Sequence, residues 1–66
     1  MTLSKRVPDE VMATTFQLLR MEHPDGRVFS YESLPLNRWE VTIVDLSGRK
    51  LAIYHVDGDD GDYMEV

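Results

Sequence analysis

The feature that most constrains this chain is a pair of strand-like runs, residues 38–45 and 49–56, joined by Leu46, Ser47 and Gly48. Both runs are rich in β-branched and aromatic residues, which favour strands. The connecting DLSGR begins with aspartate and has glycine three residues later, which is typical of a type I turn closed by a left-handed glycine. The sequence therefore predicts an antiparallel hairpin in which Gly48 has a positive φ angle.

The loop length decides which side chains of this hairpin share a face. A three-residue loop pairs Asp45 with Arg49. It gives one apolar face, expected to form the core, of Trp39, Val41, Ile43, Leu51 and Ile53. It gives an outer face of Glu40, Thr42, Val44, Lys50, Ala52 and Tyr54. A two-residue loop would place Thr42 opposite Ile53 and mix the faces, so the pattern favours the three-residue loop.

A helix over residues 8–22 is predicted before the hairpin. Pro8 suits its first position, acidic residues follow in the first turn, and Pro24 ends it. Apolar residues recur at spacings of three and four, which predicts one buried face. They are Val11, Met12, Phe16, Leu18 and Leu19. Phe16 and Leu19 are expected to pack against the apolar face of the hairpin.

Two further strands complete the predicted fold. Residues 27–32 follow an Asp-Gly turn signal, and residues 62–66 alternate again after the sequence DGDDGD. If Asp57 and Asp62 close a four-residue loop, Met64 joins the apolar face and Tyr63 points outward; a frayed tail is the alternative. We therefore predict an α+β fold over residues 1–66, with one N-terminal helix packed on a three- or four-stranded antiparallel meander.

The charge of the chain lies almost entirely at its C-terminal end. The net charge is −5, and the last twelve residues hold five acids and no base. A binder of nucleic acid or of anionic membranes needs a basic surface, so the sequence predicts neither activity. The start is polar, no run approaches the ~20 apolar residues of a membrane span, and there is no cysteine. These features predict a cytoplasmic protein.

Motifs for catalysis, cofactor binding or metal binding are not found. The serines lie in no nucleophile elbow, and there is no phosphate-binding glycine loop. The acidic stretch from Asp57 lacks the glycine and the final glutamate of a calcium-binding helix–loop–helix site. We expect no enzyme activity, no cofactor and no dedicated metal site, since a chain this small has little room for a core and a pocket.

The remaining prediction is a protein-binding surface at the acidic end. Its residues would be Tyr54, Asp57, Asp59, Asp60, Asp62, Tyr63 and Glu65. The sharper hypothesis is an inhibitor that imitates nucleic acid and binds a basic protein, for example a bacterial defence nuclease. Small size and the lack of a site motif are typical of many phage and mobile-element accessory proteins. The alternative is a structural or regulatory subunit that pairs with another chain through its sheet face or edge strand.

Overall fold

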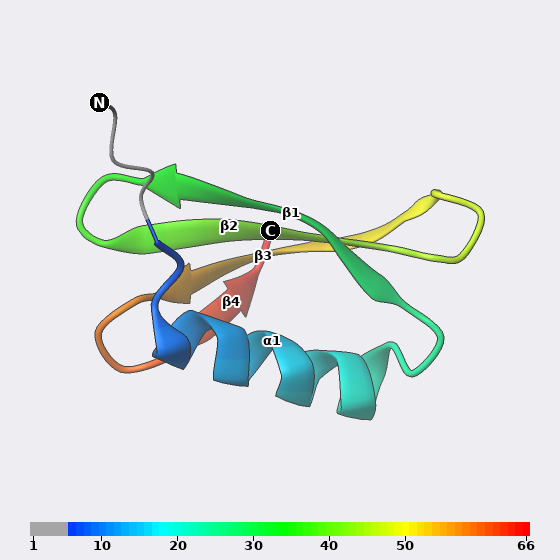
Figure 1. Cartoon of the computed structure of the whole chain (residues 1–66), viewed down its shortest axis with the longest axis horizontal. Helices are drawn as coiled ribbons and strands as arrows, with labels where there is room; N and C mark the ends of the chain where they lie inside the picture. The colour runs from blue at the N-terminus through cyan, green and yellow to red at the C-terminus, as the bar shows by residue number, and fades with distance from the viewer. Residues whose placement is uncertain (1–5) are drawn as a thin grey trace.

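The computed structural model describes residues 6–66 and has the α+β fold that the sequence predicts, with one helix packed on an antiparallel meander (Figure 1). The elements are α1 (Asp9–Glu22), β1 (Arg27–Leu34), β2 (Arg38–Val44), β3 (Lys50–Asp57) and β4 (Tyr63–Glu65). The strands form one sheet in the order β1-β2-β3-β4, and each pair of neighbours is antiparallel. The observed strand boundaries differ from the predicted ones by two residues at most.

Helix α1 begins one residue later than predicted. Pro8 is the N-cap, in an extended conformation (φ −61°, ψ 148°), rather than the first helical residue. Its carbonyl accepts the N–H groups of Val11 and Met12 at 3.1 and 3.2 Å. His23 is the C-cap, directly before Pro24, which disfavours helical geometry in the residue that precedes it.

The turn between β2 and β3 is the predicted one. The N–H of Asp45 donates to the carbonyl of Arg49 at 2.9 Å, and Gly48 has a φ angle of +91°. One carboxylate oxygen of Asp45 accepts hydrogen bonds from the Ser47 hydroxyl, the Ser47 N–H and the Arg49 N–H. These hydrogen bonds, the Ser47 hydroxyl first among them, lower the pKa of the Asp45 carboxyl.

The predicted face assignment of β3 is wrong, because a β-bulge follows the turn. Lys50 pairs with Val44 but Ala52 pairs with Ile43, so Leu51 is an extra residue in β3. A bulge of one residue changes which side chains of the following strand face the core. Ala52, Tyr54 and Val56 are consequently buried against α1. Leu51 is 41% exposed, and Ile53 lies opposite Thr42, the pairing that the three-residue loop alone does not predict.

The core lies between α1 and the sheet. Its buried apolar side chains are Val11, Leu18, Trp39, Val41, Ile43, Ala52, Tyr54 and Val56. Thr15 is also fully buried, and its hydroxyl donates to the carbonyl of Val11 at 2.7 Å. Because Val11, Thr15 and Leu18 face the sheet, Phe16 lies on the flank of the helix and is 56% exposed. The prediction that Phe16 is buried was therefore wrong, whereas Leu19 does pack partly buried against the core.

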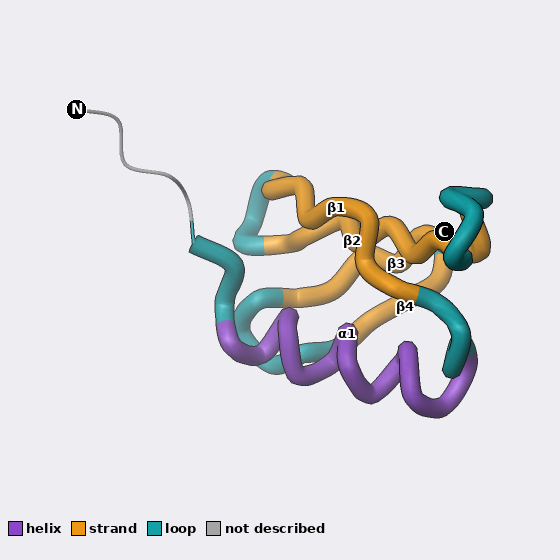
Figure 2. The backbone as a smooth tube through the Cα atoms, turned by 45° about the vertical axis from the view of Figure 1, so that its right-hand side comes forward, coloured by secondary structure: helices purple, strands orange, loops and turns teal. Residues whose placement is uncertain are grey.

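One face of the sheet is covered by α1, and within residues 6–66 no element covers the other (Figures 1 and 2). Side chains of paired residues lie on the same side of a sheet, so the strand register gives the residues of this second face. We call it the open face, and it consists of Arg27, Phe29, Ser30, Glu32, Leu34, Arg38, Glu40, Thr42, Val44, Lys50, Ile53, His55, Asp57 and Met64.

Candidate protein-binding surface

The acidic stretch forms an ordered loop between β3 and β4 rather than a frayed tail. The N–H of Asp57 donates to the carbonyl of Asp62 at 2.7 Å, which closes the four-residue loop that the sequence predicts. The Asp57 carboxylate accepts the N–H of Asp59 at 2.7 Å, and the Asp60 carboxylate accepts the N–H of Asp62 at 2.9 Å. Two of the four aspartates therefore use their side chains to shape the turn, as aspartate commonly does.

This loop is also fastened to two other parts of the fold. The hydroxyl of Thr14 on α1 donates to the carbonyl of Gly61 at 2.7 Å. The side-chain amide of Asn37, in the turn between β1 and β2, donates to the Asp59 carboxylate at 2.9 Å. The backbone carbonyl of Asn37 accepts the N–H of Gly58 at 2.7 Å. The acidic loop thus joins the helix, the first hairpin and the edge strand, while Asp59, Asp60 and Asp62 stay exposed.

The tyrosines predicted to point outward from the acidic end lie on the helix side of the sheet. Tyr54 is 4% exposed, and its hydroxyl is 2.9 Å from His23 Nε2. Its ring meets the ring of Tyr63 edge to face, and the two ring centroids are 5.9 Å apart. Burial, and secondarily the charge of Glu65, raises the pKa of the Tyr54 phenol. Tyr63 pairs with Val56 and Glu65 with Tyr54, so both lie on that side too. The bulge at Leu51 causes this placement, because it turns Tyr54 and Val56 toward α1, and the residues of β4 that pair with them lie on the same side.

The open face carries exposed apolar side chains of two strands. Phe29 is 71% exposed and Met64 is 65% exposed, although both belong to strands. Met64 lies opposite His55, as predicted, but this is the face without the helix. Val44 and Thr42, at the centre of the open face, are shielded by their neighbours and are 4% and 9% exposed.

Charges on the open face are separated along the strands. Toward the β2–β3 turn, Arg27 and Lys50 both pair with Val44. Two residues along β2 in the other direction comes Thr42, paired with Ser30 and Ile53, none of them charged. Two residues further along comes Glu40, paired with Glu32 and His55.

The acidic row therefore sets two carboxylates directly opposite each other, which is unfavourable within one sheet. Of the two, Glu40 lies 3.1 Å from His55 Nε2. Among residues 6–66, no ion pair is formed by Glu32, Arg27 or Lys50. Beyond Glu40 comes Arg38, paired with Leu34 and Asp57. The open face thus has a basic row, an uncharged row, an acidic row and, at its far end, a mixed row.

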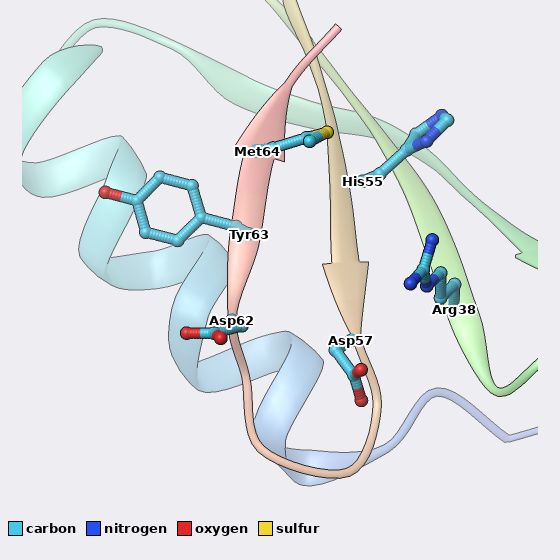
Figure 3. Close-up of a pocket in the computed structure, with 6 residues that line it drawn as sticks. All are labelled: Arg38, His55, Asp57, Asp62, Tyr63 and Met64. Atoms are coloured by element: carbon cyan, nitrogen blue, oxygen red, sulfur yellow. The ribbon is translucent and has the colours of Figure 1, made fainter.

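A hollow of ≈ 350 Å³ lies at the far end of the open face, beside the acidic loop (Figure 3). Arg38, His55, Asp57 and Met64 line it on the open side, whereas Tyr63 points toward α1. The cation of Arg38 and the carboxylates of Asp57 and Asp62 both line it, so the hollow is suited to polar contacts with a partner's surface more than to one small ion. Within the described chain, no three potential ligands are grouped so as to hold a metal ion.

Of the predicted binding residues, the structure brings Asp57, Asp59, Asp60 and Asp62 together in one loop and separates them from Tyr54. Sequence reasoning missed the open face. A signal for it was present at residues 41–44, the run VTIV, where apolar residues occupy both faces of one strand. Such a run is typical of a strand that is buried on both sides, yet within residues 6–66 a single helix covers one face of the sheet.

Comparison with known proteins gives no relative for this chain: no family model matches it, and neither the curated proteins nor the solved structures yield a significant match. In the part of the chain that the structure describes, no helix has the length and apolar character needed to span a membrane.

Proposed function

We propose that this chain is a non-enzymatic protein-binding module whose contact surface is the open face of its sheet. The observation that carries the proposal is the exposure of Phe29 and Met64 on an otherwise uncovered face. Exposed apolar surface of this kind, rimmed by charged residues, marks sites of protein association. The proposal corresponds to a structural or regulatory subunit that pairs through its sheet face.

Imitation of nucleic acid by the acidic loop is the second candidate. It is favoured by the exposure of Asp59, Asp60 and Asp62 and by the net charge of −5. It is weakened by the hydrogen bonds of the loop, because a mimic needs carboxylates spaced for a partner rather than turned onto backbone N–H groups and Asn37. In either case the partner is a protein, and direct nucleic-acid or membrane binding is not part of the proposal.

The cellular setting that we propose is the cytoplasm, where a chain without cysteine suits the reducing conditions. A phage or mobile-element accessory role, including counter-defence, is supported only by the small size and the acidic character of the chain.

A capture experiment with three matched variants tests the function. Phe29→Ser with Met64→Ser removes exposed apolar side chains from the open face. Leu36→Ser with Leu46→Ser is the control, because these leucines are 83% and 77% exposed but lie in turns. Asp59, Asp60 and Asp62 changed together to asparagine removes charge from the loop and keeps residues that favour the same turn.

Each tagged variant is used to capture partners from a lysate of the source organism, with quantification by mass spectrometry. We expect the open-face variant to lose a partner that the turn control and the asparagine variant both retain. Loss in the asparagine variant alone would replace our proposal by the nucleic-acid mimic. Retention of the same partners by all three would exclude both surfaces. Circular dichroism and the fluorescence of Trp39, the single tryptophan, establish that each variant is folded.

A further inference from the structure

We infer that the partner of the open face is a second copy of this chain, bound face to face about a two-fold axis. The inference rests on the proposed function and names the occupant of the same surface. Its basis is the order of the basic, uncharged and acidic rows, because these three rows, centred on Thr42, are complementary to themselves.

The two-fold axis would lie between the two sheets, across the strands, and pass over the uncharged row of Thr42. Such an axis brings each strand over the same strand of the second copy, running in the opposite direction. The basic row of one copy then lies over the acidic row of the other copy. Arg27 lies over Glu32 of the second copy, and Lys50 lies over His55 of the second copy, next to Glu40 of that copy. A two-fold interface repeats each contact, so each pair forms twice.

The arrangement supplies what the single chain lacks. Glu32 faces the like charge of Glu40 across the sheet, and within residues 6–66 neither Glu32 nor Arg27 has an ion-pair partner. A cation from the second copy relieves that repulsion. The centre of the contact joins the uncharged rows, where Ile53 is only partly buried in the single chain, and sheets packed in this way interdigitate such side chains at ~10 Å separation.

The area of the open face sets the strength of the expected dimer. Strands ~4.8 Å apart and ~7 residues long give a face of about 19 by 23 Å, or about 900 Å² for both copies together. This is below the ~1,200–2,000 Å² of stable specific complexes and within the range of weak, reversible ones. We therefore expect a dissociation constant of about 1–100 µM, with both species visible by sedimentation.

Charge reversal distinguishes this pairing from general repulsion between acidic chains. Arg27→Glu makes the net charge more negative and Glu32→Arg makes it less negative. Net charge alone therefore predicts weaker association for the first variant and tighter association for the second. Pairing of Arg27 with Glu32 of the second copy predicts that each single variant weakens the dimer about tenfold. The double exchange, Arg27→Glu with Glu32→Arg, should restore it to within about threefold.

The test is sedimentation velocity of the purified full chain, from low micromolar concentration upward, on the wild type, the three charge variants and Phe29→Ser. We expect a concentration-dependent dimer that Phe29→Ser and both single reversals weaken and the double exchange restores. A wild type that stays monomeric up to about 500 µM, well above the expected constant, overturns the inference. It leaves the proposed function intact, because capture of a different protein through the open face tests that separately. Tighter association of Glu32→Arg, or a dimer indifferent to all the variants, would overturn the two-fold arrangement.

Discussion

Truncation of Val56 should destabilise the fold more than truncation of Leu51, although leucine is the larger residue. The two residues lie on β3, five positions apart. Val56 is fully buried against α1, whereas Leu51 is the extra residue of the bulge and is 41% exposed. A regular hairpin without the bulge would place Leu51 in the core and reverse the order.

The expected magnitudes follow from what each truncation leaves behind. Val56→Ala removes two buried methyl groups, worth about 0.8 kcal/mol each, and leaves a cavity of roughly 50 Å³ at ~24 cal/mol per Å³. The sum is about 2–3 kcal/mol. Leu51→Ala removes more carbon, but much of it is already in water and no closed cavity remains, so the expected cost is about 1 kcal/mol. For a chain with a stability of roughly 3–10 kcal/mol, the difference is easily resolved.

The assay is equilibrium unfolding in urea, followed by the fluorescence of Trp39, which is 4% exposed and is the single tryptophan. With a slope of about 1 kcal/mol per molar urea, Val56→Ala should lower the midpoint by about 2–3 M and Leu51→Ala by about 1 M. Measurement at about 0.1 µM, below the expected dissociation constant of the proposed dimer, keeps self-association out of the comparison. A Leu51→Ala variant as unstable as Val56→Ala would refute the register, and with it the assignment of the open face.

Three further predictions concern the turns and the titrating groups. Gly48→Val should cost about 1 kcal/mol or more in urea unfolding, because φ is +91° and the added Cβ meets no atom within 4 Å, so the cost comes from the backbone alone. The pKa of Asp45 is lowered from 3.8, so its hydrogen bonds stabilise the fold above that pH and the benefit is lost as the pH falls; the stability gap between wild type and Asp45→Asn should shrink between pH 7 and pH 3. The pKa of Tyr54 is raised from 10.0 by burial, so its contribution is present below pH 10 and lost as the pH rises through the folded value. Tyr54→Phe should cost about 1 kcal/mol at neutral pH through the lost contact with His23, yet lose less stability than the wild type in alkaline solution.

Much of the fold could be predicted because its signals are local. The turn around Asp45 and Gly48 is specified by residues that touch one another, and Pro24 ends the helix by steric conflict with the residue before it. The loop from Asp57 to Asp62 is likewise closed by its own backbone and side chains. Each of these elements was found within two residues of its predicted position.

The faces of β3 could not be predicted, because nothing in the residue type of Leu51 distinguishes a bulged position from a paired one. Either register gives an apolar set, Leu51 with Ile53 or Ala52 with Val56. The choice depends on which set fits beneath the helix, and that is a tertiary effect. The same error affected the candidate site. Because Tyr54 lies in the core, the predicted tyrosine patch at the acidic end is not formed.

The same geometry explains why a helix that fits this sheet still leaves apolar surface exposed. A helix is about 10–12 Å across, and four strands at ~4.8 Å spacing are wider than that, so one helix covers about half of one face and none of the other. The exposure of Phe16 on the flank of the helix and of Phe29 on the open face follows directly. Within residues 6–66 no further element covers this surface, and association would remove it from water.

Exposed apolar surface also invites unspecific aggregation, and the acidic loop opposes it. Chains with a net charge of −5 repel one another as they approach, and at physiological salt this repulsion decays over ~8 Å. Only an orientation that gains specific contacts overcomes that repulsion, and on the open face the pairing of the basic row with the acidic row provides such an orientation. The loop charges lie outside those rows, so replacing Asp59, Asp60 and Asp62 by asparagine should leave the proposed two-fold dimer intact while lowering the solubility of the chain. The acidic loop would then oppose unspecific aggregation, and the open face would provide the specific contact.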